Sequence, residues 1–209
     1  MQTQHLTRIL TTLFVAGNLL GVFPIAGQAG VYRPHESIDW IQSISSQPTS
    51  HTLSALLFLI GALSGIYLGR HLQENGRTWA GFSLMLGSGW NALFIPVPLL
   101  LSQLVQQGHD IQGVGTQIAL GLAIFGDAMF NGLMGLSVVL LGLVHKDSTQ
   151  KFAKPMGVSG IVIGVLTMGI SGQFEYTACA DLLKVAGPLW LIWWLVWGWT
   201  VDLSTYSSD

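Results

Sequence analysis

The sequence is poor in charge and in cysteine. Only 9% of its 209 residues are charged, against about 25% in a typical soluble domain. Cys179 is the single cysteine, which excludes an intrachain disulfide and argues against cysteine-ligated metal or Cys-x-x-Cys redox chemistry. The net charge is −2 and the few basic residues are scattered, so the chain has no basic face for nucleic acid.

The chain is instead rich in hydrophobic residues. Half of its residues are hydrophobic and its mean hydropathy is +0.56. Its length holds six spans of roughly 20 residues with short loops, but no separate soluble domain. We expect a single all-α domain over residues 1–209, a six-span transmembrane helix bundle in contact with the lipid bilayer. The expected spans are residues 9–27, 52–69, 78–101, 114–144, 155–172 and 185–201.

The first apolar segment, residues 9–27, has two interpretations. A secretory signal could be cleaved near Gly27-Gln-Ala29, but the apolar run exceeds the usual length of about 7–15 residues. We favour a retained span. After it, residues 28–50 are polar, and the apolar spacing in residues 36–44 predicts a short extracytoplasmic helix lying in the membrane interface.

Glycines at four-residue spacing mark helix-packing faces. The second span carries Gly61, Gly65 and Gly69, and the fifth carries Gly160 and Gly164. Such small-residue faces let another helix approach closely. We interpret them as packing surfaces, which could serve within the bundle or dock another membrane protein.

Prolines predict where two helices break or begin. Pro96 and Pro98 interrupt residues 78–107, so the third span should break there and the piece after it should leave the bilayer. Pro188 is expected in the first turn of the last span, where a missing N–H costs least.

The last span carries a stripe of tryptophans. Trp190, Trp193, Trp194 and Trp197 share one helix face, and Trp199 falls off it. The stripe is typical of a packing or lipid-facing surface. The alternative is an aromatic wall for a small apolar ligand such as a sterol, quinone or carotenoid.

Basic residues in the short loops predict the orientation. The amino end and the second and fourth loops would hold six of them, and the opposite side only Arg33 and Lys184. Both termini are therefore expected in the cytoplasm. The six are Arg8, Arg70, Arg77, Lys146, Lys151 and Lys154.

Asp127 is the most informative residue, because it lies in the middle of the apolar segment 114–144. A carboxylate at mid-bilayer depth costs a few kcal/mol by roughly the lowest estimates, so it should face the protein interior or a wet cavity and have a partner. Asn131 is one helical turn later on the same face, and Asn91 and Asn18 are candidate partners on other spans. This cluster is the candidate ligand-binding or proton-binding site. A purely structural role, fixing how the helices pack, is the alternative.

Two other motifs are weaker. Gly157-Val-Ser-Gly160 resembles the Gly-x-Ser-Gly motif of rhomboid proteases, which have six core spans, but the last span here lacks the histidine that such a serine needs. His35 and Glu36 with Asp39 have helical spacing for metal ligands, yet lack the second histidine of the zincin pattern. We assign no catalytic residue, metal site or cofactor, and no span holds the paired histidines of a b-type haem.

The segment 155–172 and the run from Pro188 to Gly198 loosely resemble small bacterial membrane families of unknown function. That resemblance implies about six helices and no known activity. We expect the chain in a bacterial cytoplasmic membrane. The expected function is therefore a non-enzymatic membrane protein that binds or conducts a small molecule or a proton at Asp127. A non-catalytic accessory subunit with a membrane-protein partner or a second copy is the second hypothesis, and an intramembrane enzyme is the third.

Overall fold

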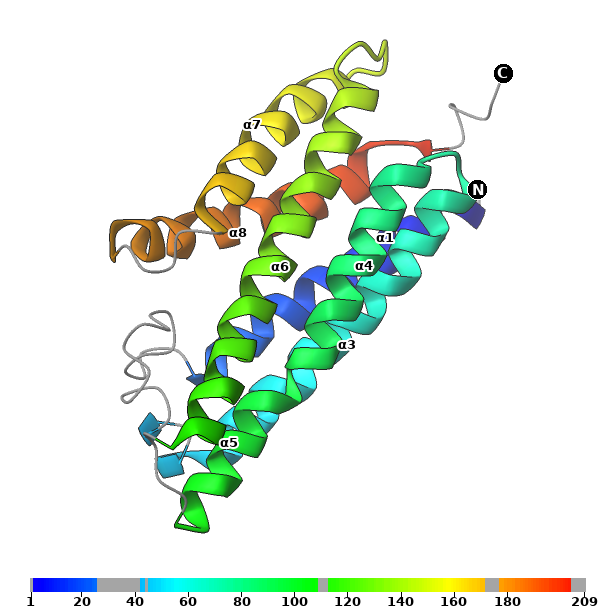
Figure 1. The fold of residues 1–209 in the computed structure, drawn as a ribbon. Coiled ribbons are helices and arrows are strands. Elements are labelled where there is room, and N and C mark those ends of the chain that lie inside the picture. The colour runs from blue at the N-terminus through cyan, green and yellow to red at the C-terminus, as the bar shows by residue number, and fades with distance from the viewer. Residues whose placement is uncertain (1, 26–41, 44, 109–112, 172–176, 204–209) are drawn as a thin grey trace.

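A computed structural model of the chain describes residues 2–25, 42–43, 45–108, 113–171 and 177–203, where all regular structure is helical (Figure 1). The all-α expectation is confirmed for this part of the chain. Most of the interfacial helix expected at residues 36–44 lies outside the described residues. The helices are α1 (Gln2–Val22), the 3-10 helix η1 (Phe23–Ile25), α3 (Pro48–Glu74), α4 (Thr78–Phe94), α5 (Pro96–Gln106), α6 (Val114–His145), α7 (Ala153–Ser171) and α8 (Thr177–Thr200).

The predicted segments differ from the helices mainly at their ends. The segments 114–144 and 155–172 match α6 and α7 to within two residues at each end. In contrast, α1 and α3 begin earlier than residues 9 and 52, because a helix continues through polar residues that a search for apolar runs leaves out.

The two proline predictions have opposite outcomes. α4 ends at Phe94 and α5 begins at Pro96, so the predicted break is confirmed. The expectation that Pro188 lies in a first turn is wrong, because α8 begins at Thr177 and Pro188 lies inside it. A proline inside a helix removes one backbone hydrogen bond, which neighbouring helices in a membrane bundle can compensate.

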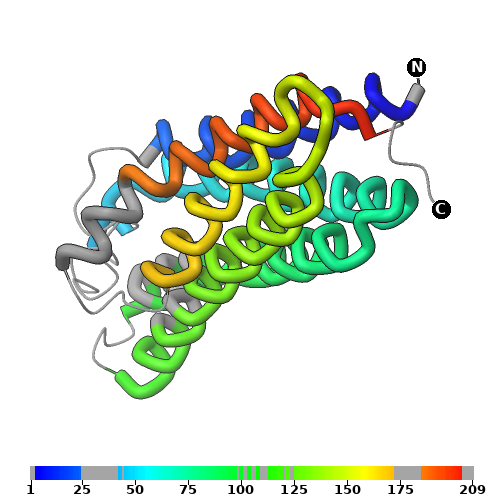
Figure 2. Tube along the Cα trace, turned by 90° about the horizontal axis from the view of Figure 1, so that it is seen from above, coloured from blue at the N-terminus to red at the C-terminus, as the bar shows by residue number. Residues whose placement is uncertain are grey.

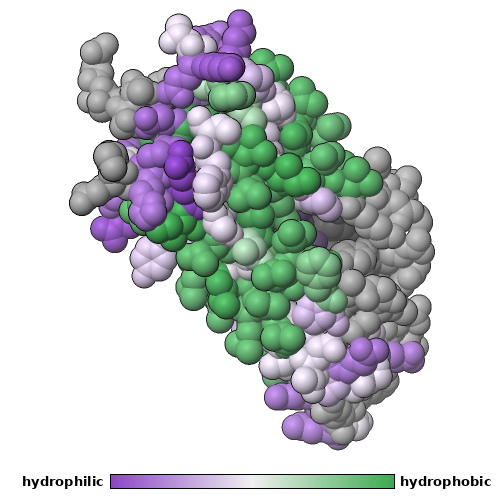
Figure 3. All heavy atoms as spheres, turned by 180° about the vertical axis from the view of Figure 1, so that it is seen from behind, coloured by the Kyte–Doolittle hydropathy of each residue, from purple (hydrophilic) through white to green (hydrophobic). Residues whose placement is uncertain are grey.

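Four helices in the described part of the chain contain segments long and apolar enough to cross a membrane. Their outward side chains are apolar and exposed, among them Leu13, Leu56, Leu63 and Val162. Figure 3 shows the resulting apolar belt on one face of the molecule, between two more polar ends. The four segments long and apolar enough to cross a membrane are Thr3–Val22, Pro48–Glu74, Phe125–His145 and Ala153–Ser171.

The helices pack as a closed ring in the order α1, α3, α4, α6, α7, α8 and back to α1. Figure 2 shows α1 and α8 side by side along one edge of the molecule. The ring is closed by contacts between α1 and α8, where Trp199 Nε1 near the end of α8 donates to Thr12 Oγ1 in the middle of α1 at 3.2 Å. The core inside the ring is apolar and aromatic, with Phe14, Leu68, Met134 and Trp194 fully buried.

The glycine faces are used inside this ring, as the packing interpretation predicted. A Cβ at Gly61 would meet Asn18 of α1, and one at Gly69 would meet the carbonyl oxygen of Gly81 on α4. A Cβ at Gly164 would lie 2.5 Å from the carbonyl oxygen of Gly135 on α6. These faces are therefore not available to dock another membrane protein.

Candidate functional site

The inner face of α6 carries a continuous stripe from Asp127 to His145. These two residues are about five turns apart at 3.6 residues per turn, so they point the same way. Met134, Val138 and Leu141 lie between them on the same face, and all three are 0% exposed. His145 is also 0% exposed. The stripe therefore faces the inside of the ring.

Asp127 lies on this inward stripe but is exposed. The inner side of α6 is thus closed from Met134 to His145 and accessible at Asp127. One cause is the length of α7, which ends at Ser171 beside Gly132 of α6. No residue of α7 flanks the part of α6 that contains Asp127.

Asn131 is the nearest predicted partner. Its Nδ2 donates to the main-chain carbonyl oxygen of Asp127 at 2.9 Å, the bond that its position one turn later allows. The amide is therefore fixed beside Asp127 within a single helix. This contact needs no other helix.

Asn91 and Asn18 lie at about the same depth as Asp127. On α4, Asn91 is one turn before Phe94, which packs on Gly126 of α6. On α1, Asn18 packs against Gly61 of α3. Because α3 and α4 run antiparallel, the part of α3 around Gly61 lies opposite Asn91 of α4.

The structure does not join these two amides to the acid. In the described part of the chain, no hydrogen bond links Asp127 with Asn18 or Asn91, and Asn18 Nδ2 instead donates to the Phe14 carbonyl oxygen at 2.8 Å. The four predicted residues thus form a polar level across three helices, without direct bonds between the helices.

An aromatic layer closes the ring just beyond this polar level. Phe130, one turn after Asp127, lies with its ring centroid 6.1 Å from that of Trp190, which is 5.9 Å from that of Phe14. Trp190, Trp193, Trp194 and Trp197 are all buried, whereas Trp199 is 51% exposed. The predicted stripe is therefore a packing surface directed into the core.

A second polar centre lies at the opposite end of the ring. His71 of α3, Arg77 before α4 and His145 of α6 are all buried there, and Arg77 is close enough to His145 for their charges to interact. His145 also packs against Trp197, with 6.1 Å between ring centroids. Sequence reasoning placed these side chains in loops and missed the centre. The inward stripe on α6 is the signal that could have found His145.

The turn between α3 and α4 positions Arg77. Gly76 has φ +77°, a conformation that favours glycine. Its N–H donates to the Gln73 carbonyl oxygen, and that of Arg77 donates to the Leu72 carbonyl oxygen at 2.8 Å. This is the hydrogen-bond pattern of a Schellman motif. It reverses the chain so tightly that Arg77 turns inward.

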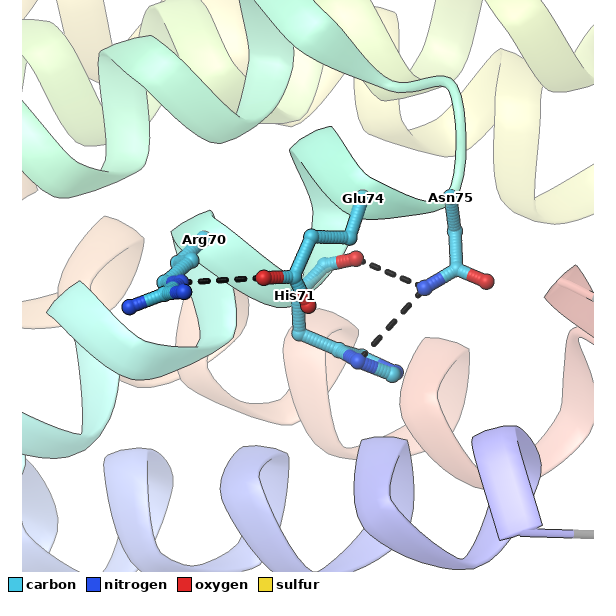
Figure 4. Close-up of polar contacts among 4 residues, drawn as sticks. All are labelled: Arg70, His71, Glu74 and Asn75. Carbon is cyan, nitrogen blue, oxygen red and sulfur yellow. Dashed lines mark hydrogen bonds and ion pairs between the residues drawn. The ribbon is translucent and has the colours of Figure 1, made fainter.

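His71 connects this turn to α1. Its Nε2 lies 3.0 Å from Thr7 Oγ1, and Asn75 Nδ2 donates to the His71 carbonyl oxygen at 2.7 Å. Figure 4 shows the His71 ring pointing from α3 toward α1, while Arg70 and Glu74 pair with each other at 2.9 Å on the exposed side. The α3 end thus has a buried polar side and a solvated ionic side.

The weaker motifs gain no support from the geometry. Ser159 Oγ donates to the Met156 carbonyl oxygen at 3.2 Å, and Gly160 packs on Trp193. Among the described residues there is no group of three or more His, Cys, Asp or Glu side chains that could hold a metal ion. The metal-like spacing at His35 falls outside those residues.

The chain was compared with known proteins in three ways. No protein-family model, no curated protein and no solved structure matches it. The resemblance to bacterial membrane families of unknown function therefore stays a prediction.

Proposed function

We propose that the chain is an integral membrane protein of a bacterial cytoplasmic membrane that binds a small molecule or a proton at Asp127. One observation carries this proposal: Asp127 is exposed on the same helix face on which Met134, Val138 and Leu141 are fully buried. An ionisable group inside a membrane segment usually serves a binding site or an ion path. Here it faces the ring interior, not the lipid.

The proposal includes six crossings with both termini in the cytoplasm. α4 is 17 residues long, about 26 Å at 1.5 Å per residue, and α5 prolongs it. α8 is 24 residues long and packs beside α7 and α1. Arg8 and Trp199 meet at one end of the ring, with 3.5 Å between Arg8 Nη2 and the Trp199 carbonyl oxygen. The other five basic residues predicted on the cytoplasmic side lie near the turns after α3 and α6, at that end as well, in agreement with the positive-inside rule.

Native mass spectrometry in mild detergent tests the binding function. We expect a bound molecule in the wild type, its loss in Asp127→Asn, and its retention in Asp147→Asn. Asp147 is the matched control because its side chain is 85% exposed in the turn after α6. Thermal melting should be equal in all three proteins.

Two results would contradict the proposal. If Asp127→Asn keeps the bound molecule, Asp127 does not bind it. If all three proteins are empty, the proton function is tested by measuring proton uptake after reconstitution into vesicles. Equal uptake rates in wild type and Asp127→Asn would exclude a proton function. A lowered melting temperature in Asp127→Asn, with function unchanged, would assign Asp127 a structural role.

A further inference from the structure

We propose that the seam between α1 and α8 binds the headgroup of an anionic phospholipid at its cytoplasmic end, with Arg8 as the cation that contacts the lipid phosphate. This inference goes beyond the proposed function, because it names a second binding surface that does not include Asp127. It takes from that function only the orientation of the ring in the membrane. Three features carry it: the way α8 holds Arg8 at the surface, the positions of the acidic residues, and the apolar side chains nearby.

Arg8 is held at the outer surface of the ring by the end of α8. Its Nη2 donates to the Trp199 carbonyl oxygen at 3.5 Å, and its guanidinium carbon lies 5.4 Å from the centre of the Trp199 ring. The ring is fixed in turn, because its Nε1 donates to Thr12 Oγ1 one turn further along α1. Trp199 is 51% exposed, and the hydrogen bond from Arg8 is exposed as well. The positive charge is therefore accessible from outside the protein, at the seam between the two neighbouring helices (Figure 2).

A cation at this position needs an anion. Arg8 lies inside Thr3–Val22, the segment of α1 apolar enough to cross a membrane, within about two turns of its start. Basic side chains near the ends of such helices reach toward the lipid headgroups. The anionic lipids of the cytoplasmic leaflet place phosphate groups at that level. A guanidinium has several N–H donors and the bond to Trp199 uses one of them, so donors remain for a phosphate.

Two acidic residues at the same end of the ring already have basic partners. Glu74 pairs with Arg70 at 2.9 Å, and Asp147 pairs with Lys146 at 3.8 Å. Both pairs lie beside the turns after α3 and α6. Neither of them includes Arg8, so these two acids do not balance its charge.

The remaining acidic residues of the described chain are Asp127, Asp181 and Asp202. Asp127 lies at the opposite end of the ring, and Asp181 is about five helical turns before Trp199 in α8. Asp202 is close to Trp199 in sequence, and Gln150 holds its main chain through two hydrogen bonds, of 3.1 and 3.3 Å. The variant Asp202→Asn therefore separates the charge of this residue from that of a lipid.

Apolar side chains continue from Arg8 and Trp199 toward the middle of the membrane. Val196 and Ile192 lie one and two turns before Trp199 on the same side of α8 and are 41% and 56% exposed. Leu13 of α1 is 45% exposed. Tryptophan is common at the headgroup level of membranes. A phospholipid whose phosphate meets Arg8 can therefore place its acyl chains along this surface, which a free phosphate ion does not use.

Native mass spectrometry of the purified protein in mild detergent measures lipid binding directly. Phosphatidylglycerol and phosphatidylethanolamine are added at equal concentrations, since both carry a phosphate but only the first has a net negative charge. We expect the wild type to bind phosphatidylglycerol more tightly than phosphatidylethanolamine, and Arg8→Gln to bind phosphatidylglycerol about fivefold more weakly than the wild type. Lys154→Gln removes the same charge from an exposed position at the same end and should bind like the wild type. Asp127→Asn and Asp202→Asn should also bind like the wild type.

The tryptophan contribution has its own matched pair. Trp199→Phe keeps an aromatic ring beside Arg8 and should bind phosphatidylglycerol nearly as tightly as the wild type. Trp199→Leu removes the ring and should bind it more weakly. Melting curves of all variants identify any loss of folding.

Thermal melting gives a second measurement that needs no uncharged variant. Phosphatidylglycerol should raise the melting temperature of the wild type and of Arg8→Lys, which keeps the charge, more than phosphatidylethanolamine does. Inorganic phosphate at the same concentration should have no effect.

Four outcomes would overturn the inference. Equal phosphatidylglycerol binding by wild type and Arg8→Gln would remove Arg8 from the site, and an equal loss in Lys154→Gln would indicate a general charge effect. Tighter binding by Asp202→Asn would mean that Asp202 is the partner of Arg8. Displacement of phosphatidylglycerol by inorganic phosphate would indicate a site for free anions.

The proposed function is tested separately. A molecule bound at Asp127 is identified by its loss in Asp127→Asn and its retention in Arg8→Gln, whatever the result for phosphatidylglycerol. If that molecule is absent and proton uptake is unchanged, the proposed function fails, and Arg8-dependent binding of phosphatidylglycerol still supports the lipid site.

Discussion

His71 Nε2 lies 3.0 Å from Thr7 Oγ1, and this contact links the end of α3 to the start of α1. Thr7 Oγ1 also lies 2.9 Å from the Thr3 carbonyl oxygen, to which it donates its one proton. The hydroxyl can then only accept from His71, so Nε2 must carry a proton. Nδ1, 3.5 Å from Asn75 Nδ2, is left as the acceptor side of the ring.

The first prediction is therefore the tautomer of His71. Long-range ¹H–¹⁵N NMR of protein labelled at histidine should show neutral His71 protonated at Nε2, with its signal assigned by its loss in His71→Gln. Thr7→Val removes the acceptor from a fully buried site and should destabilise the protein by about 1 kcal/mol. Thr7→Ser keeps the hydroxyl and should melt close to the wild type. A ring protonated at Nδ1 would contradict this hydrogen-bond assignment.

The second prediction concerns the close approach of α6 and α7. Gly164→Ala places a Cβ 2.5 Å from the Gly135 carbonyl oxygen, which is main chain and cannot turn aside. We expect a loss of about 1–3 kcal/mol in thermal or SDS unfolding. Gly169→Ala on the same helix meets nothing within 4 Å and should melt at or slightly above the wild type. Equal effects of the two changes would mean that α6 and α7 do not pack through Gly164.

The third prediction concerns the turn after α3. Gly76 has φ +77° and open space around it, so Gly76→Ala should cost about 1–2 kcal/mol through backbone conformation alone. Gly89 also has open space but lies inside α4, so Gly89→Ala should be neutral or stabilising. Melting temperatures of the two variants give the comparison. A neutral Gly76→Ala would argue against the Schellman turn that places Arg77 inside.

The fourth prediction concerns the orientation of α6. In a Cys179→Ser background, Asp147→Cys and Gln107→Cys each place one thiol on an exposed position, after α6 and after α5 respectively. A membrane-impermeant maleimide added to intact cells should label the cysteine at 107 and not the one at 147. After lysis both should react. Labelling of both in intact cells would contradict the crossing of α6.

Much of the fold could be predicted from apolar runs and prolines. Residues 114–144 and 155–172 are nearly α6 and α7, and the break at Pro96 is where it was expected. Helix ends were less accurate, since polar residues can extend a helix beyond its apolar part. This is why α8 begins at Thr177 and contains Pro188.

The candidate site was predicted only in part. Asp127 was identified because a charge is costly in an apolar segment, and that cost can be read from one helix alone. Whether Asn91 and Asn18 lie near it depends on the register between helices, which no single segment determines. The burial of His71 and Arg77 was missed for a related reason. His71 lies in the last turn of α3 and Arg77 directly after the following turn, a polar segment that looks solvated in sequence, yet both side chains are buried.

The ring of helices joins the first helix of the described chain to the last. Phe14 of α1 packs on Trp194 of α8, with 5.8 Å between ring centroids, and a Cβ at Gly198 would meet Thr11. During synthesis this side of α1 therefore stays uncovered until α8 has been made. The contact between α1 and α8 therefore forms late in assembly, because α8 is the last described helix to be synthesised. A chain shortened before Trp194 would keep all four helices with span-like segments, yet leave Phe14 of α1 without this aromatic partner.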